Sequence, residues 1–339
     1  MKIVIDDKIP YISETLALLV DEVVALPGSR ISAADVRDAD ALIVRTRTRC
    51  DENLLSGSKV SFVATATIGF DHIDTQYLEQ SGIEWMSCPG CNSSAVAQYV
   101  RSSLLLLIRE KGIVPSDTTI GIVGCGHVGS KVKALAEDMG FSVMVCDPPK
   151  AESGEAGTFV DISDIAAGCD IITFHVPYST EGRYPTLHLA DSAFFDSLRR
   201  KPWIINTSRG EVVDTSALLR AIDCGQVTDA VIDTWENEPD INLTLLNKVY
   251  IGTPHIAGYS AEGKVNADNM VVDGLCRHFG LERPSVILPP PLPEGTIIPE
   301  SGEERMLALY NPLADSGMLK ASPESFEELR GNYPVRRET

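Results

Sequence analysis

Short apolar runs alternate with helix-length connections along most of this chain, and this alternation limits the possible fold more than any other feature of the sequence. Parallel strands joined by helices produce such a pattern, with helices covering both faces of the sheet. We therefore predict an α/β fold with two doubly wound parallel-sheet domains and a small C-terminal appendage. The runs typical of strands are Ile3–Ile5, Ala41–Val44, Phe62–Thr65, Glu84–Met86, Thr119–Val123, Ser142–Cys146, Ile171–Phe174, Trp203–Asn206, Asp229–Asp233 and Val249–Gly252.

Two long helical patterns indicate where the chain passes between the domains. Asn92–Lys111 predicts one helix, with Asn92 or Ser93 as its N-cap, and Ala261–Leu281 predicts another that returns to the first domain. Shorter helices are expected at Tyr11–Leu19 and Asp71–Gln80. The expected division is a flavodoxin-like domain of residues 1–95 and 262–285, a Rossmann-like domain of residues 96–261, and a C-terminal region of residues 286–339 that contains the stiff linker Pro289–Pro293.

The charge balance excludes two classes of partner. The 339 residues include 48 acidic and 29 basic side chains, a net charge of -19, so no broad basic face can form for nucleic acid or an anionic membrane surface. No apolar run reaches the length of a membrane span, and the first residues lack the apolar stretch of a signal peptide. With eight cysteines, mostly in apolar surroundings, the sequence predicts a reduced, cytoplasmic protein.

A glycine-rich turn, Gly124-Cys-Gly-His-Val-Gly129, lies between a strand pattern and a helix pattern. In a dinucleotide-binding Rossmann turn, Gly124 permits the sharp bend, Gly126 lets a pyrophosphate approach the backbone, and Gly129 allows close packing of helix and strand. Asp147 ends the next strand and is placed to accept hydrogen bonds from a ribose. Because its carboxylate would repel a 2′-phosphate, we predict NAD rather than NADP as the cofactor. The alternative is a turn that serves packing alone.

Three residues that suit hydride transfer on a 2-hydroxy acid follow successive strands. Arg209 offers a planar fork that matches a carboxylate, and His255 can take up the hydroxyl proton. Glu238 can fix the tautomer of the histidine and stabilise its charged form. Each residue alone is more often an ordinary surface or loop group. In this order, at strand ends downstream of a dinucleotide turn, the three predict a catalytic site without a metal.

The stretch Thr119–Gly258 resembles the D-2-hydroxyacid dehydrogenase family, whose arginine, glutamate and histidine fall on the three residues above. The resemblance implies a substrate-binding first domain, NAD as the cofactor and a homodimer, for which residues 286–339 would form a shortened C-terminal dimerisation region. Wider matches resemble a member that oxidises 4-phospho-D-erythronate to (R)-3-hydroxy-2-oxo-4-phosphobutanoate in pyridoxal 5′-phosphate synthesis. They are Ala64–Thr67, Asp71–Asp74, Cys88–Asn92, Cys146–Pro149, Thr186–Asp191 and Thr253–Ser260.

The same resemblance implies further contacts by position. For the substrate these are Thr46, Thr67 and Tyr259, where Thr46 stands in place of a serine and keeps the hydroxyl. Val176 stands where a hydroxyl residue is expected beside the cofactor. The loss of one hydrogen bond to the cofactor corresponds to about 0.5–1.5 kcal/mol of binding free energy. Besides the three glycines, Asp147 and Val176, the cofactor-contacting positions are His127, Val128, Thr207, Ser208, Asp233 and Gly258.

Arg45, Arg47 and Arg49 form an unusual basic cluster in this acidic chain. In an extended segment they would share one side and Thr46 and Thr48 the other, so either set could hold a phosphate. We predict that Arg45 binds the substrate. Whether Arg47 and Arg49 contact phosphate or pair with nearby acids stays open.

Several alternatives also remain open. The substrate could be another D-2-hydroxy acid, such as 3-phosphoglycerate or glycerate, or the chain could be a non-catalytic NAD-sensing interaction protein. The sequence also does not decide whether NAD exchanges freely or stays bound. Cys88 and Cys91 have redox or zinc spacing but no second pair, so a structural role is expected. His72 and His175 are expected to support packing or to hold other site residues.

Overall fold

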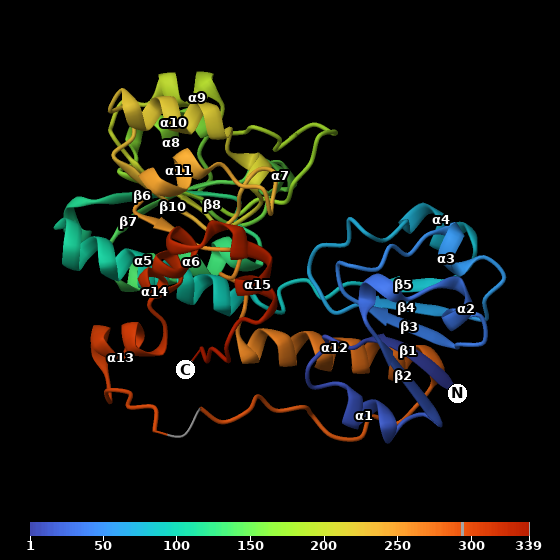
Figure 1. Ribbon diagram of the computed structural model, residues 1–339. Coiled ribbons are helices and arrows are strands. Elements are labelled where there is room, and N and C mark those ends of the chain that lie inside the picture. The colour runs from blue at the N-terminus through green and yellow to red at the C-terminus, as the bar shows by residue number, and fades with distance from the viewer. Residues whose placement is uncertain (293–294, 339) are drawn as a thin grey trace. The chain divides into compact units, whose positions relative to one another are not determined.

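The computed structural model describes residues 1–292 and 295–338. It contains two compact units, which are described separately (Figure 1). Unit 1 is Met1–Asn92 with Ser260–Leu292, and unit 2 is Ser93–Tyr259 with the described part of residues 293–339. Of the expected C-terminal region, Pro293, Glu294 and Thr339 lie outside the described residues. Among the described residues, no helix is both long enough and apolar enough to cross a membrane.

Unit 1 is a five-stranded parallel sheet in the order β2-β1-β3-β4-β5. One face packs on α12, and residues of α2, α3 and α4 are buried against the other. Side chains along β1 alternate between the faces, with Ile3 and Ile5 toward α12 and Val4 on the opposite side. The strands are β1 Lys2–Asp6, β2 Glu22–Leu26, β3 Ala41–Val44, β4 Phe62–Thr65 and β5 Glu84–Met86, and the helices are α1 Ser13–Ala17, α2 Ala33–Val36, α3 Glu52–Leu55, α4 Thr75–Gln80 and α12 Ala261–Phe279.

The predicted bounds of β3, β4 and β5 are confirmed, but three predictions in unit 1 are corrected. Strand β2 was missed, although Val23–Leu26 is an apolar run; it is an edge strand with no fully buried residue. The helix expected at Asp71–Gln80 begins only at Thr75, because Asp74 caps it by accepting from the Tyr77 amide. The helix expected at Tyr11–Leu19 is the shorter α1.

Unit 2 is a six-stranded parallel sheet in the order β11-β10-β9-β8-β6-β7. The predicted bounds of β6 to β9 are confirmed, and the last two strands are shorter than predicted. The strands are β6 Thr119–Val123, β7 Ser142–Cys146, β8 Ile171–Phe174, β9 Trp203–Asn206, β10 Asp229–Ile232 and β11 Ile251–Gly252. The helices are α5 Ser93–Lys111, α6 His127–Asp138, α7 Pro148–Ser153, α8 Ile162–Gly168, α9 Ser192–Ser197, α10 Thr215–Asp223, α11 Leu243–Lys248, α13 Gly302–Leu309, α14 Pro312–Ala321 and α15 Phe326–Gly331.

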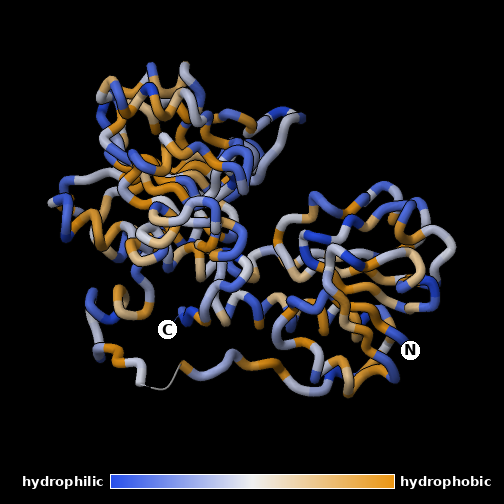
Figure 2. The backbone as a smooth tube through the Cα atoms, viewed as in Figure 1, coloured by the Kyte–Doolittle hydropathy of each residue, from blue (hydrophilic) through white to orange (hydrophobic). Residues whose placement is uncertain are grey.

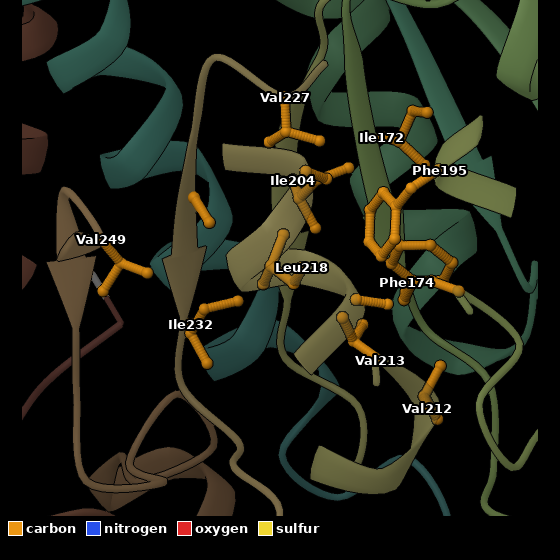
Figure 3. Packing of buried hydrophobic residues seen from close by; sticks show 14 of the residues in the cluster. Ile172, Phe174, Phe195, Ile204, Val212, Val213, Leu218, Val227, Ile232 and Val249 are labelled. Carbon is orange, nitrogen blue, oxygen red and sulfur yellow. The ribbon is translucent and has the colours of Figure 1, made fainter. Parts of the chain in front are cut away.

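The sheet of unit 2 has a buried core on each face. Ile204 and Ile232 pack with Leu218 and Phe195 on one side (Figure 3), whereas Ile205 packs with α5 and α6 on the other. In Figure 2 the strands of both units are hydrophobic in colour, as expected for parallel strands covered on both faces. The predicted α/β fold with two parallel sheets is therefore confirmed.

The C-terminal helices are part of the packing of unit 2. Leu319 of α14 and Phe326 of α15 are buried in one core cluster, and Tyr310 is buried in the other. The Ser316 hydroxyl accepts a hydrogen bond from the amide of Gly252 in β11, at 3.0 Å. The segment is small, as expected, and it packs against the strand that precedes His255.

Candidate active site

Three loops of unit 2 follow the neighbouring strands β9, β10 and β11 at their carboxyl ends. In open parallel sheets this edge is where ligands bind. The loops carry Arg209, Glu238 and His255 respectively. The topology therefore brings together the three loops that carry the predicted trio, and the contacts below show how each residue is held.

The loop that carries Arg209 is organised by Asn206, the last residue of β9. Its side-chain oxygen accepts from the Ser208 amide at 3.1 Å and from the Ser208 hydroxyl at 2.7 Å, and its amide group donates to the Arg209 carbonyl at 3.0 Å. Sequence reasoning missed this role, although an asparagine at the end of a strand, before Ser and Gly, often bonds to the backbone that follows. Ser208 is consequently buried, with its hydroxyl engaged by Asn206.

Gly210 brings this loop against the next one. A Cβ atom at this position would lie 1.9 Å from the carbonyl carbon of Trp235, so only glycine permits the approach. Trp235 in turn joins all three loops. Its amide donates to Glu238 Oε1 at 2.9 Å, and its indole donates to the Thr253 carbonyl at 2.8 Å. The backbones around Arg209, Glu238 and His255 are thus packed as one group.

Glu238 and His255 form a hydrogen-bonded pair. His255 Nδ1 donates to Glu238 Oε2 at 2.8 Å, and the two side chains are 25% and 17% exposed. Burial tends to raise the pKa of Glu238, but the charge and hydrogen bond of His255 and the Trp235 amide lower it below its usual value. Glu238 is therefore ionised, and His255 Nε2 remains as the nitrogen that can exchange a proton with a substrate.

The backbone around His255 is held by Asp233. This buried carboxylate accepts from the Thr253 hydroxyl at 2.6 Å and from the amides of Ile256 and Ala257 at 2.8 and 2.9 Å. These bonds hold His255 in a left-handed conformation with φ of 56°, which non-glycine residues seldom adopt outside functional sites. Burial raises the pKa of Asp233, against the effect of its partners. The predicted contact of Asp233 with the cofactor stays a prediction, as does that of Gly258.

The glycine-rich turn has the geometry that a dinucleotide requires. Gly124 has φ of 89°, and a Cβ atom there would lie 2.6 Å from the His175 carbonyl oxygen. Gly129 packs closely against Gly124, because a Cβ atom at position 129 would lie only 1.9 Å from the carbonyl oxygen of Gly124. At Gly126, by contrast, a Cβ atom would have no neighbouring atom within 4 Å. The turn is closed on the protein side and open at the N-terminus of α6, where a pyrophosphate would lie.

Asp147 lies beside this turn, at the carboxyl end of β7. Its carboxylate accepts from the Cys125 amide at 2.7 Å and from the Lys150 amide at 3.1 Å. Each carboxylate oxygen can accept a second bond, so the group is still able to hold ribose hydroxyls. His127 and Val128 begin α6, with His127 exposed and Val128 half-buried. The residues present therefore fit NAD.

Two alanine substitutions in this turn are expected to have opposite effects. Gly126→Ala should leave the melting temperature within about 1 °C but weaken NAD binding at least tenfold, because its methyl group occupies the space reserved for the pyrophosphate. Gly129→Ala should lower the melting temperature by several degrees, because its methyl group meets the Gly124 carbonyl. Thermal unfolding and NAD titration of both variants check this; equal losses of stability would contradict it.

His175 lies under the predicted nicotinamide side of the site. Its Nε2 is 2.9 Å from the Thr173 hydroxyl, and its Nδ1 is 3.3 Å from the hydroxyl of Thr207, a predicted cofactor contact. Burial lowers the pKa of His175 to about 3, so the ring is neutral and serves to orient Thr207. Val176 packs against the hydrophobic core. The expected supporting role of His175 agrees with these contacts.

In unit 1, Arg45 and Thr67 follow the adjacent strands β3 and β4 at the carboxyl edge of the sheet. Arg45 donates to the Lys8 carbonyl at 3.2 Å. Thr67 is hydrogen-bonded to Thr65 at 2.6 Å, and Thr65 is bonded to His72 at 3.0 Å. Burial lowers the pKa of His72, so a neutral ring supports this chain of hydroxyls.

The expected alternation of Arg45, Arg47 and Arg49 is wrong. The strand ends at Val44, and the next residues form a turn, so they do not share one side of an extended segment. Thr46 is exposed, whereas Thr48 is buried with its hydroxyl donating to the Gly28 carbonyl. Arg49 is 70% exposed and paired with Asp51 at 3.2 Å. The two threonines therefore cannot act together on one ligand.

Cys88 is buried in unit 1. Its thiol lies 3.4 Å from the Thr65 carbonyl and 3.5 Å from the Ala267 carbonyl, and burial raises its pKa far above the usual value. A thiol held in this way is a structural group. Among residues 1–292 and 295–338, no group of three or more His, Cys, Asp or Glu side chains is arranged to hold a metal ion.

Comparisons with known proteins agree with this geometry. Residues 99–257 match the family described as D-isomer specific 2-hydroxyacid dehydrogenase, NAD binding domain. An erythronate-4-phosphate dehydrogenase of Bacteroides thetaiotaomicron is 56% identical over 338 residues, which span 100% of this chain and 97% of that protein.

Solved structures share the fold. The NAD⁺-bound 3-phosphoglycerate dehydrogenase of Entamoeba histolytica has a TM-score of 0.68 and 27% identity, over 83% of this chain and 95% of that one. D-lactate dehydrogenase of Aquifex aeolicus, complexed with NAD and lactic acid, has a TM-score of 0.69 and 23% identity, over 82% of this chain and 96% of that one.

The glycine turn and the three packed loops on one sheet edge define an NAD-dependent dehydrogenase of 2-hydroxy acids. The chain belongs to the D-isomer-specific 2-hydroxyacid dehydrogenase family and, within it, to the erythronate-4-phosphate dehydrogenases.

Proposed function

We propose that this chain oxidises 4-phospho-D-erythronate to (R)-3-hydroxy-2-oxo-4-phosphobutanoate, with NAD as the acceptor, in pyridoxal 5′-phosphate synthesis. The observation that carries this proposal is the Glu238–His255 pair, held beside the Arg209 loop on the carboxyl edge of the sheet. The substrate is taken from the full-length likeness to erythronate-4-phosphate dehydrogenases.

The proposed roles follow from the chemistry of the three groups. Arg209 binds the substrate carboxylate through its guanidinium fork. His255 Nε2 accepts the proton of the 2-hydroxyl group, and the imidazolium that forms is stabilised by Glu238 at 2.8 Å. When bound, NAD supplies the hydride acceptor. The reverse reaction uses the same groups, with protonated His255 as the acid.

For the substrate phosphate we propose Arg45, with Thr46, Thr67 and Tyr259 as further substrate contacts. Arg45 and Thr67 lie at the carboxyl ends of neighbouring strands in unit 1, and Arg45 is half-buried and fixed by the Lys8 carbonyl. A pre-positioned guanidinium suits a phosphate because its parallel donors can bind two oxygens at once.

The proposed function is tested by following NADH formation at alkaline pH with 4-phospho-D-erythronate, 3-phospho-D-glycerate and D-glycerate in parallel. A 2-oxo acid is added in separate reactions, in case NADH stays bound and must be reoxidised in place. Preference for phosphoerythronate supports the proposal, and preference for another acid keeps the chemistry but replaces the substrate. NAD binding without turnover of any acid would support the non-catalytic sensing alternative.

Arg45→Met is expected to raise the KM for the phosphorylated substrate by about 10- to 100-fold, because a charge-assisted bond to phosphate is lost. NAD affinity should stay unchanged. Arg49→Met is the matched control, since Arg49 is exposed and pairs with Asp51. Steady-state kinetics of both variants decide the matter; equal KM values for Arg45→Met and the unaltered protein would remove Arg45 from the site.

We also propose that the protein acts as a cytoplasmic homodimer. The support is the family resemblance for the dimer and the eight cysteines, all of which are free thiols, for a reducing compartment. Light scattering after size-exclusion chromatography gives the molar mass directly. A monomer at micromolar concentration would contradict the dimer.

A further inference from the structure

A third charged residue contacts the acid–base pair from the C-terminal segment. Arg330, in the last turn of α15, has Nη1 3.7 Å from Glu238 Oε2. This is the same oxygen that accepts the hydrogen bond from His255 Nδ1. The Arg330 side chain is 23% exposed, and it is also hydrogen-bonded to the side chain of Tyr259.

The residues after Arg330 hold the loop that follows His255. Arg336 is 5% exposed and donates to the carbonyl oxygens of Ala257 and Ile256, at 2.6 and 3.3 Å. The ring of Tyr333 packs edge-on against that of Tyr259, with 6.0 Å between centroids. The segment 330–336 thus contacts this loop at three of the four residues that follow His255.

Tyr333 and Arg336 of this segment are themselves fixed. The Tyr333 hydroxyl donates to Asp315 of α14 at 2.8 Å. The Arg336 guanidinium lies over the ring of Tyr310, 4.2 Å from its centroid, and donates to the Ala95 carbonyl of α5 at 3.2 Å. These contacts hold the backbone that follows Arg330, while the Arg330 side chain itself is held by Tyr259 and Glu238.

We propose that Arg330 is a positioning residue for proton transfer, which orients Glu238 and sets the proton affinity of the Glu238–His255 pair from the C-terminal segment. This inference rests on the proposed roles of Glu238 and His255.

The expected direction follows from the charges around the pair. The titratable and charged groups around the pair are three acids, one phenol and one fixed positive charge. The acids are Glu238, Asp233 and Glu327, the phenol is that of Tyr259, and the positive charge is the guanidinium of Arg330. Removing the guanidinium makes the carboxylate of Glu238 less stable and removes a repulsion that acts on protonated His255. The imidazole should therefore hold its proton to higher pH.

Arg330→Met tests this through the pH dependence of hydroxy-acid oxidation, which requires neutral His255. The midpoint of the acidic limb of kcat/KM is expected to move up by about 0.5–1 pH unit. At pH values below both midpoints, the rate of oxidation should fall about 3- to 10-fold by this effect alone. Arg330→Lys retains the positive charge, so the midpoint of its acidic limb should lie close to that of the unaltered protein.

Arg305→Met is the matched control. Arg305 belongs to α13 of the same C-terminal region and donates to the Pro299 carbonyl, away from the acid–base pair. Its substitution should leave the pH profile unchanged. A lower rate for Arg330→Met with an unmoved midpoint, or an equal shift in Arg305→Met, would overturn the inference.

A second measurement keeps this test independent of turnover. The imidazole resonances of His255 can be assigned among the six histidines by comparison with a His255 variant, and then titrated with and without Arg330. A higher midpoint in Arg330→Met supports the inference even if no hydroxy acid is turned over, a result that would refute only the proposed function. Identical midpoints in a folded Arg330→Met variant would refute the role of Arg330.

Discussion

Replacing His255 by asparagine is expected to lower kcat/KM for hydroxy-acid oxidation by about 10²- to 10⁴-fold, the usual contribution of a positioned general base. Asparagine tolerates the left-handed backbone that His255 adopts, so the loop should keep its conformation. NAD binding should be retained, because the pyrophosphate turn lies on β6 and α6. Steady-state kinetics and NAD titration check both parts.

The chain offers a close control in His188. This histidine also has a left-handed backbone, with φ of 49°, and its Nε2 is paired with Glu236 at 2.7 Å. It lies in a different loop and has no predicted role in proton transfer. His188→Asn should therefore keep kcat/KM within about twofold. If His188→Asn lost as much activity as His255→Asn, the effect would come from damage to the fold and not from the loss of a base.

Arg209→Met is expected to lower kcat/KM by about 10²- to 10³-fold, mostly through a higher KM, because the carboxylate of the substrate loses its bidentate partner. Removing one partner of a buried, hydrogen-bonded charge pair typically costs about 2–5 kcal/mol of binding free energy. Lysine at this position should restore only part of the activity, since it keeps the charge but lacks the planar fork.

Arg220→Met serves as the control for Arg209. Arg220 is 46% exposed on α10 and pairs with Asp196 at 3.0 Å, so its removal costs little. Unchanged kinetics in Arg220→Met, together with the loss in Arg209→Met, would assign the effect to carboxylate binding. A KM for the hydroxy acid that is unaltered in Arg209→Met would exclude that role.

The strands in the middle of each sheet were predictable because they are buried on both faces. Strands β3, β4, β8 and β9 are buried throughout, and local composition is then sufficient to place them. The edge strand β2 has no fully buried residue, and it was missed although Val23–Leu26 is an apolar run. The helix bounds depended on capping residues, and Asp74 was recognisable only with the structure in hand.

The candidate site was predictable where the residues follow strands in order. Arg209, Glu238 and His255 lie on loops after three neighbouring strands, so their proximity follows from the topology. Asn206 acts through its own loop and was missed, although a local signal existed. Arg330 and Arg336 come from a segment far along the chain, and no local pattern indicates which loop they contact.

The network around His255 also bears on the timing of catalysis. Among the described residues, the groups shown to hold this side chain and its loop, from Asp233 to Trp235 and Glu238, lie within unit 2. The proposed proton acceptor is therefore assembled when this unit folds, and no free energy of substrate binding is needed to build it. Substrate binding has to supply only the alignment of the hydroxy acid.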